Sequence, residues 1–144
     1  MLLIGSDHGG FRLKQELCVY LQKMDILFED VGTYTDQSCD YPIFAKKVAE
    51  KVSQNNVHRG ILICTSGVGM AIAANKFHGV YAARLTNSDE VRQSVKHNGI
   101  NVLCLPGDLS VNNAYELIKA FLNTLVDESE RHVRRRKQIK SFEQ

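Results

Sequence analysis

The fold is decided by residues 60–77, which read GILICTSGVGMAIAANKF. A short apolar run ends at Cys64, two glycines follow at Gly67 and Gly69, and an alanine-rich segment begins behind them. A run of this length suits a buried strand, close glycines suit a tight turn, and the alanines suit a helix. The stretch therefore predicts a strand that passes directly into a helix, as in the βαβ units of a parallel sheet.

The same alternation continues along the chain in both directions. Short apolar runs predict strands, and segments with helical spacing of apolar residues lie between them. The predicted strands are Leu2–Gly5, Ile26–Val31, Gly60–Cys64, Val80–Arg84 and Asn101–Leu105. The predicted helices cover residues 11–24, 41–54, 69–77, 88–97 and 112–126. Together they predict an α/β fold, a three-layer, doubly wound (Rossmann-like) sheet of five parallel strands with a C-terminal helical extension.

Length and cysteine spacing restrict the class of protein. A chain of 144 residues can bury a sizeable core without disulfides. Its four cysteines are widely and irregularly spaced with no C-x-x-C pair, which favours the reduced thiols of a cytosol. The first ten residues contain no basic leader or long apolar segment, and no run approaches the length of a membrane span. We therefore expect a cytoplasmic protein with no membrane contact.

The net charge of +2 lies at the C-terminal end of the chain. Residues 127–144 hold six basic and four acidic residues, whereas residues 1–126 are balanced. We expect a single α/β domain at 1–126 and a basic extension at 127–144. Such an extension suits a nucleic acid, a phosphate ligand or a solvated helix face. Residues 131–140, RHVRRRKQIK, have no interleaved aromatic residues and no reading motif, so we expect no nucleic-acid partner.

Ligands of open parallel sheets bind outside the carboxyl ends of the strands. The loops there read SDHGG, GTYTDQSCDYP, CTSGVG, LTNSD and LPGD in chain order. In CTSGVG, the glycines allow backbone N–H groups to converge on an anion at the start of a helix, either a phosphate or an enediolate oxyanion. No Gly-Lys-Ser/Thr follows, which excludes a nucleotide-binding P-loop. The alternative is structural, since a tight strand-to-helix turn needs glycine in any case.

Five polar residues, at three places in or near these loops, have both a chemical and a structural interpretation. Cys64 is either a small buried hydrophobe or a thiolate, favoured by the adjacent helix N-terminus, that acts as nucleophile or base. Asp7 and His8 follow the first strand, and Asp7 alone could be a helix cap. His97 and Asn98 precede the fifth strand, where a lone histidine is commonly a surface residue. No histidine, cysteine or carboxylate cluster has metal-ligand spacing, so we expect neither metal nor cofactor.

Five strings occur in one order between Ile4 and Ile139. They are SDHGGFRLK, DYP, GILICTSGVGMAIAANKF, HNGINVL and RHVRRRKQI. Together they resemble ribose-5-phosphate isomerase type B, in the family that also includes allose-6-phosphate and galactose-6-phosphate isomerases. The strings D-H-x-G-F-x-L-K and [TS]-G-x-G-x-x-I-A-A-N-K are specific to that family. The resemblance implies an aldose–ketose isomerase that interconverts D-ribose 5-phosphate and D-ribulose 5-phosphate through a cis-enediol, without metal or cofactor.

The resemblance also assigns roles to individual residues. It implies that Cys64 is the base, that Ser66 assists proton transfer at the substrate oxygens, and that Asp7 and His97 open the furanose ring. The enediolate would be held by the backbone amides of Gly67, Val68, Gly69 and Met70. The substrate would also contact Tyr41 and Asn98, and its phosphate would contact His8, Arg131 and Arg135. Met70 occupies the position of the glutamate base of another sub-group, which indicates the cysteine-based sub-group.

Further implications concern the phosphate, the assembly and the alternatives. The family usually has a phosphate-binding arginine where this chain has Asp108, and Lys76, Arg134 or Arg136 could replace it. The resemblance implies a homodimer, with a tetramer as the alternative, in which the C-terminal segment reaches the neighbouring subunit's site. A six-carbon sugar phosphate isomerase and a non-catalytic phosphosugar-binding module are the competing functions.

Overall fold

The computed structural model describes residues 1–143 and contains one five-stranded sheet in the order β2-β1-β3-β5-β4. All neighbouring strands pair in parallel. The strands are β1 (Leu2–Ser6), β2 (Phe28–Asp30), β3 (Arg59–Cys64), β4 (Ala82–Arg84) and β5 (Val102–Pro106). The predicted fold class is therefore confirmed. Because the strands are parallel, all of them begin along one border of the sheet, here called the amino edge, and all of them end along the opposite border, the carboxyl edge.

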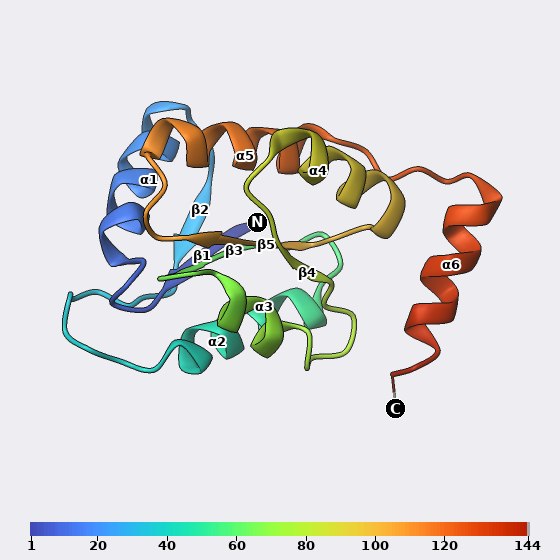
Figure 1. Cartoon of the computed structure of the whole chain (residues 1–144), viewed down its shortest axis with the longest axis horizontal. Coiled ribbons are helices and arrows are strands. Elements are labelled where there is room, and N and C mark those ends of the chain that lie inside the picture. The colour runs from blue at the N-terminus through green and yellow to red at the C-terminus, as the bar shows by residue number, and fades with distance from the viewer. Residues whose placement is uncertain (144) are drawn as a thin grey trace.

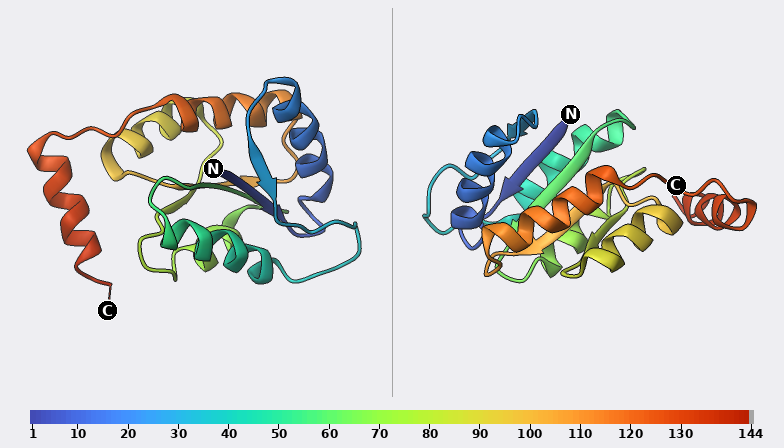
Figure 2. Two further views of the ribbon diagram at one scale, coloured as in Figure 1. Left: turned by 180° about the vertical axis from the view of Figure 1, so that it is seen from behind. Right: turned by 90° about the horizontal axis from the view of Figure 1, so that it is seen from above.

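Helices cover both faces of the sheet (Figure 1). One layer contains α1 (Phe11–Lys23), α4 (Ser88–Gln93) and α5 (Val111–Asn123), and the other contains α2 (Tyr41–Gln54) and α3 (Val68–Ala74). A π-helical turn, η1 (Ser94–Asn98), continues α4. The C-terminal helix α6 (Glu130–Lys140) belongs to neither layer and stands beside the β4 end of the sheet (Figures 1 and 2).

Local sequence signals explain where several helices begin. Pro42 lies in the first turn of α2, where its missing N–H costs nothing. The side chain of Asn87 accepts hydrogen bonds from Asp89 N and Glu90 N at the start of α4. The start of α5 is capped by Ser110 Oγ, which accepts from the N–H of Asn113 at 3.1 Å. These caps satisfy N–H groups that the helices themselves leave without partners.

The three central strands are buried on both faces, as expected of a parallel sheet covered by helices. Side chains alternate along β3, with Ile61 and Ile63 toward α1 and α5 and Leu62 toward α2 and α3. Two of the other cysteines have packing roles, because Cys104 is fully buried and Cys18 packs against the core. Burial raises the pKa of Cys104, and burial together with Asp30 raises the pKa of Cys18 to about 11. Both thiols therefore stay protonated at neutral pH.

Several elements are shorter in the structure than the sequence predicts. The predicted strands 26–31 and 80–84 form only over Phe28–Asp30 and Ala82–Arg84, because β2 and β4 are edge strands with a partner on one side only. The predicted helix 69–77 begins at Val68 and ends at Ala74. The predicted helix 88–97 changes from α-helix to a π-helical turn after Gln93.

A buried ion pair fixes the loop that follows β2. Lys14 of α1 has no exposed surface, and its ammonium lies 2.7 Å from Asp30 Oδ2. The other carboxylate oxygen of Asp30 accepts a hydrogen bond from Gly32 N. In addition, Ser6 N donates to the carbonyl of Gly32, and Thr33 N donates to the carbonyl of Ser6. The ion pair thus holds the β2 loop against the residue that directly precedes Asp7 and His8.

Candidate active site

The carboxyl edge of the sheet brings together nine of the predicted site residues: Cys64, the turn residues 66–70, Asp7, His8 and Tyr41. Cys64 is the last residue of β3, Asp7 and His8 directly follow β1, and Tyr41 begins α2. The Tyr41 ring lies against the first turn of α3, since a carbon added at Gly69 would lie 2.6 Å from its Cζ. Gly69 is therefore needed for this approach of the phenol to the turn. As expected for a parallel sheet, the polar loop residues converge at this edge.

The turn after Cys64 is organised around its sulfur. Cys64 is only 4% exposed, and its Sγ accepts a hydrogen bond from Gly67 N at 3.1 Å. Gly67 has a φ of +78°, a conformation that favours glycine. Ser66 Oγ accepts from Val68 N at 3.2 Å. Of the four amides expected to hold an anion, those of Gly67 and Val68 are thus engaged inside the turn.

The remaining two amides are available to a ligand. The N–H groups of Gly69 and Met70 lie in the first turn of α3 and have no hydrogen-bond acceptor within residues 1–143. Helix N-termini leave such donors for a ligand or water. The Met70 side chain is fully buried, so this residue can act on a ligand only through its backbone. The turn therefore offers two adjacent donors beside the Cys64 thiol.

Asp7 and His8 are both held by hydrogen bonds to neighbouring backbone. Asp7 Oδ1 accepts from Gly9 N at 2.9 Å and Gly10 N at 3.1 Å. These bonds close the turn before α1, whose N-cap is Gly10 with no side-chain cap, so the helix-cap interpretation of Asp7 is wrong. His8 Nδ1 accepts from Cys39 N at 3.2 Å. In the neutral imidazole the proton then lies on Nε2, and the exposed His8 ring presents a donor to a ligand.

The other predicted side chains lie at the opposite edge of the sheet. His97 and Asn98 belong to η1, which precedes β5, and the His97 ring stacks on His132 of α6 with centroids 4.2 Å apart and planes 9° apart. Arg131 and Arg135 project from the same helix, are exposed, and have no carboxylate within 4.0 Å in the described chain. Within one chain, the structure does not bring these four residues to Cys64.

His132 is a site neighbour that the sequence analysis did not identify. It is 7% exposed, and its Nε2 lies 3.8 Å from Asp127 Oδ2. Desolvation, followed by the nearby His97 and Arg131, lowers the pKa of His132. A neutral, buried imidazole therefore supports one face of the His97 ring. No periodic pattern in the sequence indicates such a stack between η1 and α6.

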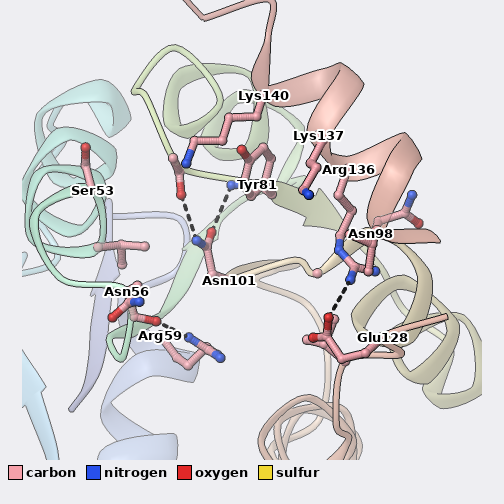
Figure 3. Close-up of a pocket in the computed structure, with 15 residues that line it drawn as sticks. Ser53, Asn56, Arg59, Tyr81, Asn98, Asn101, Glu128, Arg136, Lys137 and Lys140 are labelled. Atoms are coloured by element: carbon pink, nitrogen blue, oxygen red, sulfur yellow. Dashed lines mark hydrogen bonds and ion pairs between the residues drawn. The ribbon is translucent and has the colours of Figure 1, made fainter. Parts of the chain in front are cut away.

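A basic cleft of about 470 Å³ lies between α6 and the amino edge of the sheet (Figure 3). On its floor, the side chain of Asn101 bonds to Gly79 O and Tyr81 N, both at 2.8 Å. On the α6 side, Arg136 donates to His97 O at 3.2 Å and lies 3.6 Å from Glu128. Also lining the cleft are Asn56, Arg59, Asn98, Lys137 and Lys140. No motif in the sequence predicts this cleft.

The position expected to carry a phosphate-binding arginine is occupied by Asp108, and Arg12 lies near it. Asp108 is exposed at the end of β5, and Arg12 Nη2 donates to the neighbouring carbonyl of Gly107 at 3.3 Å. The suggested replacements Arg134 and Arg136 lie on α6, and Lys76 lies near the end of that helix. Within its own chain, none of the three therefore lies beside Asp108.

The helices of the described chain are all too short or too polar to cross a bilayer. Residues 1–143 contain no group of three or more histidine, cysteine, aspartate or glutamate side chains arranged to hold a metal ion.

Comparison with known proteins gives one consistent family. A family model described as Ribose/Galactose Isomerase matches residues 2–139. The chain is 36% identical over 144 residues to ribose-5-phosphate isomerase B of Escherichia coli K12, covering 99% of this chain and 96% of that protein. It is 40% identical over 104 residues to ribose-5-P isomerase B of Listeria innocua, covering 72% of this chain and 70% of the relative.

Solved structures agree with the sequence relatives. Ribose-5-phosphate isomerase B of Clostridium thermocellum is 40% identical, with a TM-score of 0.92 over 99% of this chain and 96% of that one. The Mycoplasma genitalium enzyme, solved with bound ribulose-5-phosphate, is 35% identical with a TM-score of 0.92, covering 99% and 95% of the two chains. With its doubly wound sheet, its Cys64 turn and these matches over nearly its whole length, the chain belongs to the ribose/galactose isomerase family.

Proposed function

We propose that this chain is a cytoplasmic aldose–ketose isomerase that interconverts D-ribose 5-phosphate and D-ribulose 5-phosphate. The observation that carries the proposal is the Cys64 turn, where a thiol lies beside the unengaged amides of Gly69 and Met70. The names of the relatives and the ribulose-5-phosphate bound to the Mycoplasma genitalium enzyme support the choice of substrate. The four unpaired cysteines suit a reducing compartment.

The proposed reaction is a proton transfer between two carbons. The Cys64 thiolate removes the proton from C2 of the open-chain aldose, and the negative charge moves to the carbonyl oxygen at C1. The free amides of the turn stabilise this enediolate, and Ser66 passes a proton between the oxygens on C2 and C1. Cys64 then returns its proton to C1, which gives the ketose. No electron leaves the substrate, so the net reaction needs no redox partner.

Ring opening requires groups from both edges of the sheet. We assign it to Asp7, which is at the carboxyl edge, and His97, which is at the amino edge. Because one chain holds these residues at opposite edges, we infer a homodimer in which the amino edge of one subunit faces the carboxyl edge of the other. Asn98 would then contact sugar hydroxyls, while Arg131 and Arg135 of the second subunit, with His8 of the first, would bind the phosphate. A tetramer would contain two such dimers.

Exposed apolar side chains support this assembly. Val68 and Ile72 lie one turn apart on α3, next to the Cys64 turn, and both are about half exposed or more. Ile139 and Phe142 are exposed at the end of the C-terminal segment. Apolar patches on a soluble protein commonly mark a surface that a partner covers. In this proposal, residues 1–126 form the isomerase domain, and residues 127–144 contribute to the dimer and the phosphate site.

A substrate panel tests the proposed function. Purified protein is assayed with ribose 5-phosphate, allose 6-phosphate and galactose 6-phosphate, each with and without EDTA. We expect kcat/KM for ribose 5-phosphate to exceed the others by at least about tenfold, because an extra CH–OH unit must fit a pocket built for a shorter chain. We expect EDTA to have no effect.

Each alternative gives a different result in the same panel. Faster turnover of a six-carbon substrate would assign the chain to that branch of the family. Binding of all three sugars without ketose formation would indicate a phosphosugar-binding module. Loss of activity in EDTA would contradict the metal-free mechanism.

A further inference from the structure

Arg84 lies directly against the turn that holds Cys64. It is the last residue of β4, the outermost strand on one side of the sheet. Arg84 therefore lies at the carboxyl edge, where β3 also ends. Its Nε donates to the backbone carbonyl of Ser66 at 2.9 Å. Its Cγ lies 3.0 Å from the position that a side-chain carbon of Gly67 would occupy, so the aliphatic stem also packs on the turn. Arg84 is therefore held on the turn by both its stem and its guanidinium.

These contacts connect the guanidinium to the Cys64 sulfur through a single peptide group. The Ser66 carbonyl that accepts from Arg84 belongs to the same peptide as Gly67 N–H, which donates to Cys64 Sγ at 3.1 Å. Hydrogen bonds in series polarise one another, and charged donors form the stronger bonds. A cation on the carbonyl thus makes this N–H a better donor, which favours a thiolate acceptor over a neutral thiol.

The positive charge of Arg84 is not neutralised by an ion pair. No carboxylate oxygen lies within 4.0 Å of its guanidinium in residues 1–143. The other ionisable groups packed around the turn are Asp7, Tyr41 and Cys104. Burial and the neighbouring Cys64 raise the pKa of Cys104, which leaves that thiol uncharged. Among these groups, Arg84 is the cation in direct contact with the turn.

We propose that Arg84 is a positioning residue that stabilises the Cys64 thiolate through the Ser66–Gly67 peptide and so extends isomerase activity toward lower pH. This inference rests on the proposed role of Cys64 as the base. Arg84 does not need to touch the substrate for this effect. Its contribution is to increase the fraction of enzyme in which Cys64 is ready to accept the C2 proton.

Thiolate titration tests the inference without any substrate. The ultraviolet absorbance of the thiolate is followed against pH, and the signal of Cys64 is taken as the difference from the same protein carrying Cys64→Ser. We expect Arg84→Met to raise the midpoint by about one pH unit, a tenfold loss of thiolate below that midpoint. Arg84→Lys, which keeps the charge, should raise it by less than half as much. The acid limb of kcat/KM against pH should move in parallel.

The matched control is Arg92→Met, which removes an exposed arginine paired with Asp89 on α4. We expect this variant to leave the midpoint unchanged. An unchanged midpoint in a folded Arg84→Met protein would overturn the inference, as would an equal shift in Arg92→Met. If Arg84→Met does not fold, Arg84→Gln, which keeps a neutral donor, replaces it with the same expected direction. A shifted midpoint in a protein that converts no sugar phosphate would support the coupling while contradicting the proposed function.

Discussion

Replacing Cys64 with alanine is expected to lower kcat by about 10³-fold, within the 10²–10⁴-fold range of general acid–base catalysis. The variant removes the group that accepts the C2 proton but keeps the amides of Gly69 and Met70, which need only the backbone. Substrate binding should therefore change by less than about threefold, since the lost interaction belongs to the transition state. The two quantities are measured by a coupled isomerase assay and by calorimetric titration with ribulose 5-phosphate.

The control for this variant is Cys104→Ala. Cys104 is also a buried cysteine and faces the same helical layer, but its raised pKa keeps it protonated. We expect this variant to retain kcat within about threefold, because it loses only packing and no proton-transfer group. Retention of more than about a tenth of wild-type kcat by Cys64→Ala would exclude Cys64 as the base.

Mixing two inactive variants is expected to restore activity. In a dimer with shared sites, Cys64→Ala and His97→Ala each damage every site of their own homodimer. A mixed dimer has one site that lacks both groups and one site that is intact. With random exchange, half of the dimers are mixed, so activity should return to about a quarter of the wild-type value per subunit. The measurement is the isomerase rate after subunit exchange, confirmed by native mass spectrometry.

A second mixture provides the control for shared sites. Cys64 and Asp7 lie at the same edge of one chain, so a mixed dimer of Cys64→Ala and Asp7→Ala has one defect in each of its two sites. This mixture should stay inactive. Recovery in this control, or no recovery with His97→Ala after confirmed exchange, would contradict a site formed across the interface.

The sheet could be predicted because its central strands carry a strong local signal. Burial on both faces makes residues 59–64 almost uniformly apolar, and the glycine turn that follows defines where the strand ends. The helix at 41–54 has the predicted bounds, and Pro42 marks its first turn. The edge strands were predicted too long, because pairing on one side ends earlier than the apolar sequence does.

The part of the candidate site at the carboxyl edge could also be predicted, from the rule that parallel strands place their following loops at one edge. Cys64, Asp7, His8 and Tyr41 follow this rule. The stack of His97 on His132 could not be predicted, because it joins distant segments through contacts that leave no periodic pattern. The contact of Arg84 with the turn could not be predicted either. The sequence shows only a charged residue that follows two alanines at the end of a predicted strand.

The most direct test of the account is a crystal structure of the protein with ribulose 5-phosphate. The account predicts C1 and C2 beside Cys64 Sγ of one subunit, with an oxygen of the sugar on the amides of Gly69 and Met70. It predicts the phosphate at His8 of that subunit and at Arg131 and Arg135 of the second. A phosphate bound on the glycine turn, or a sugar surrounded by residues of one chain alone, would contradict it.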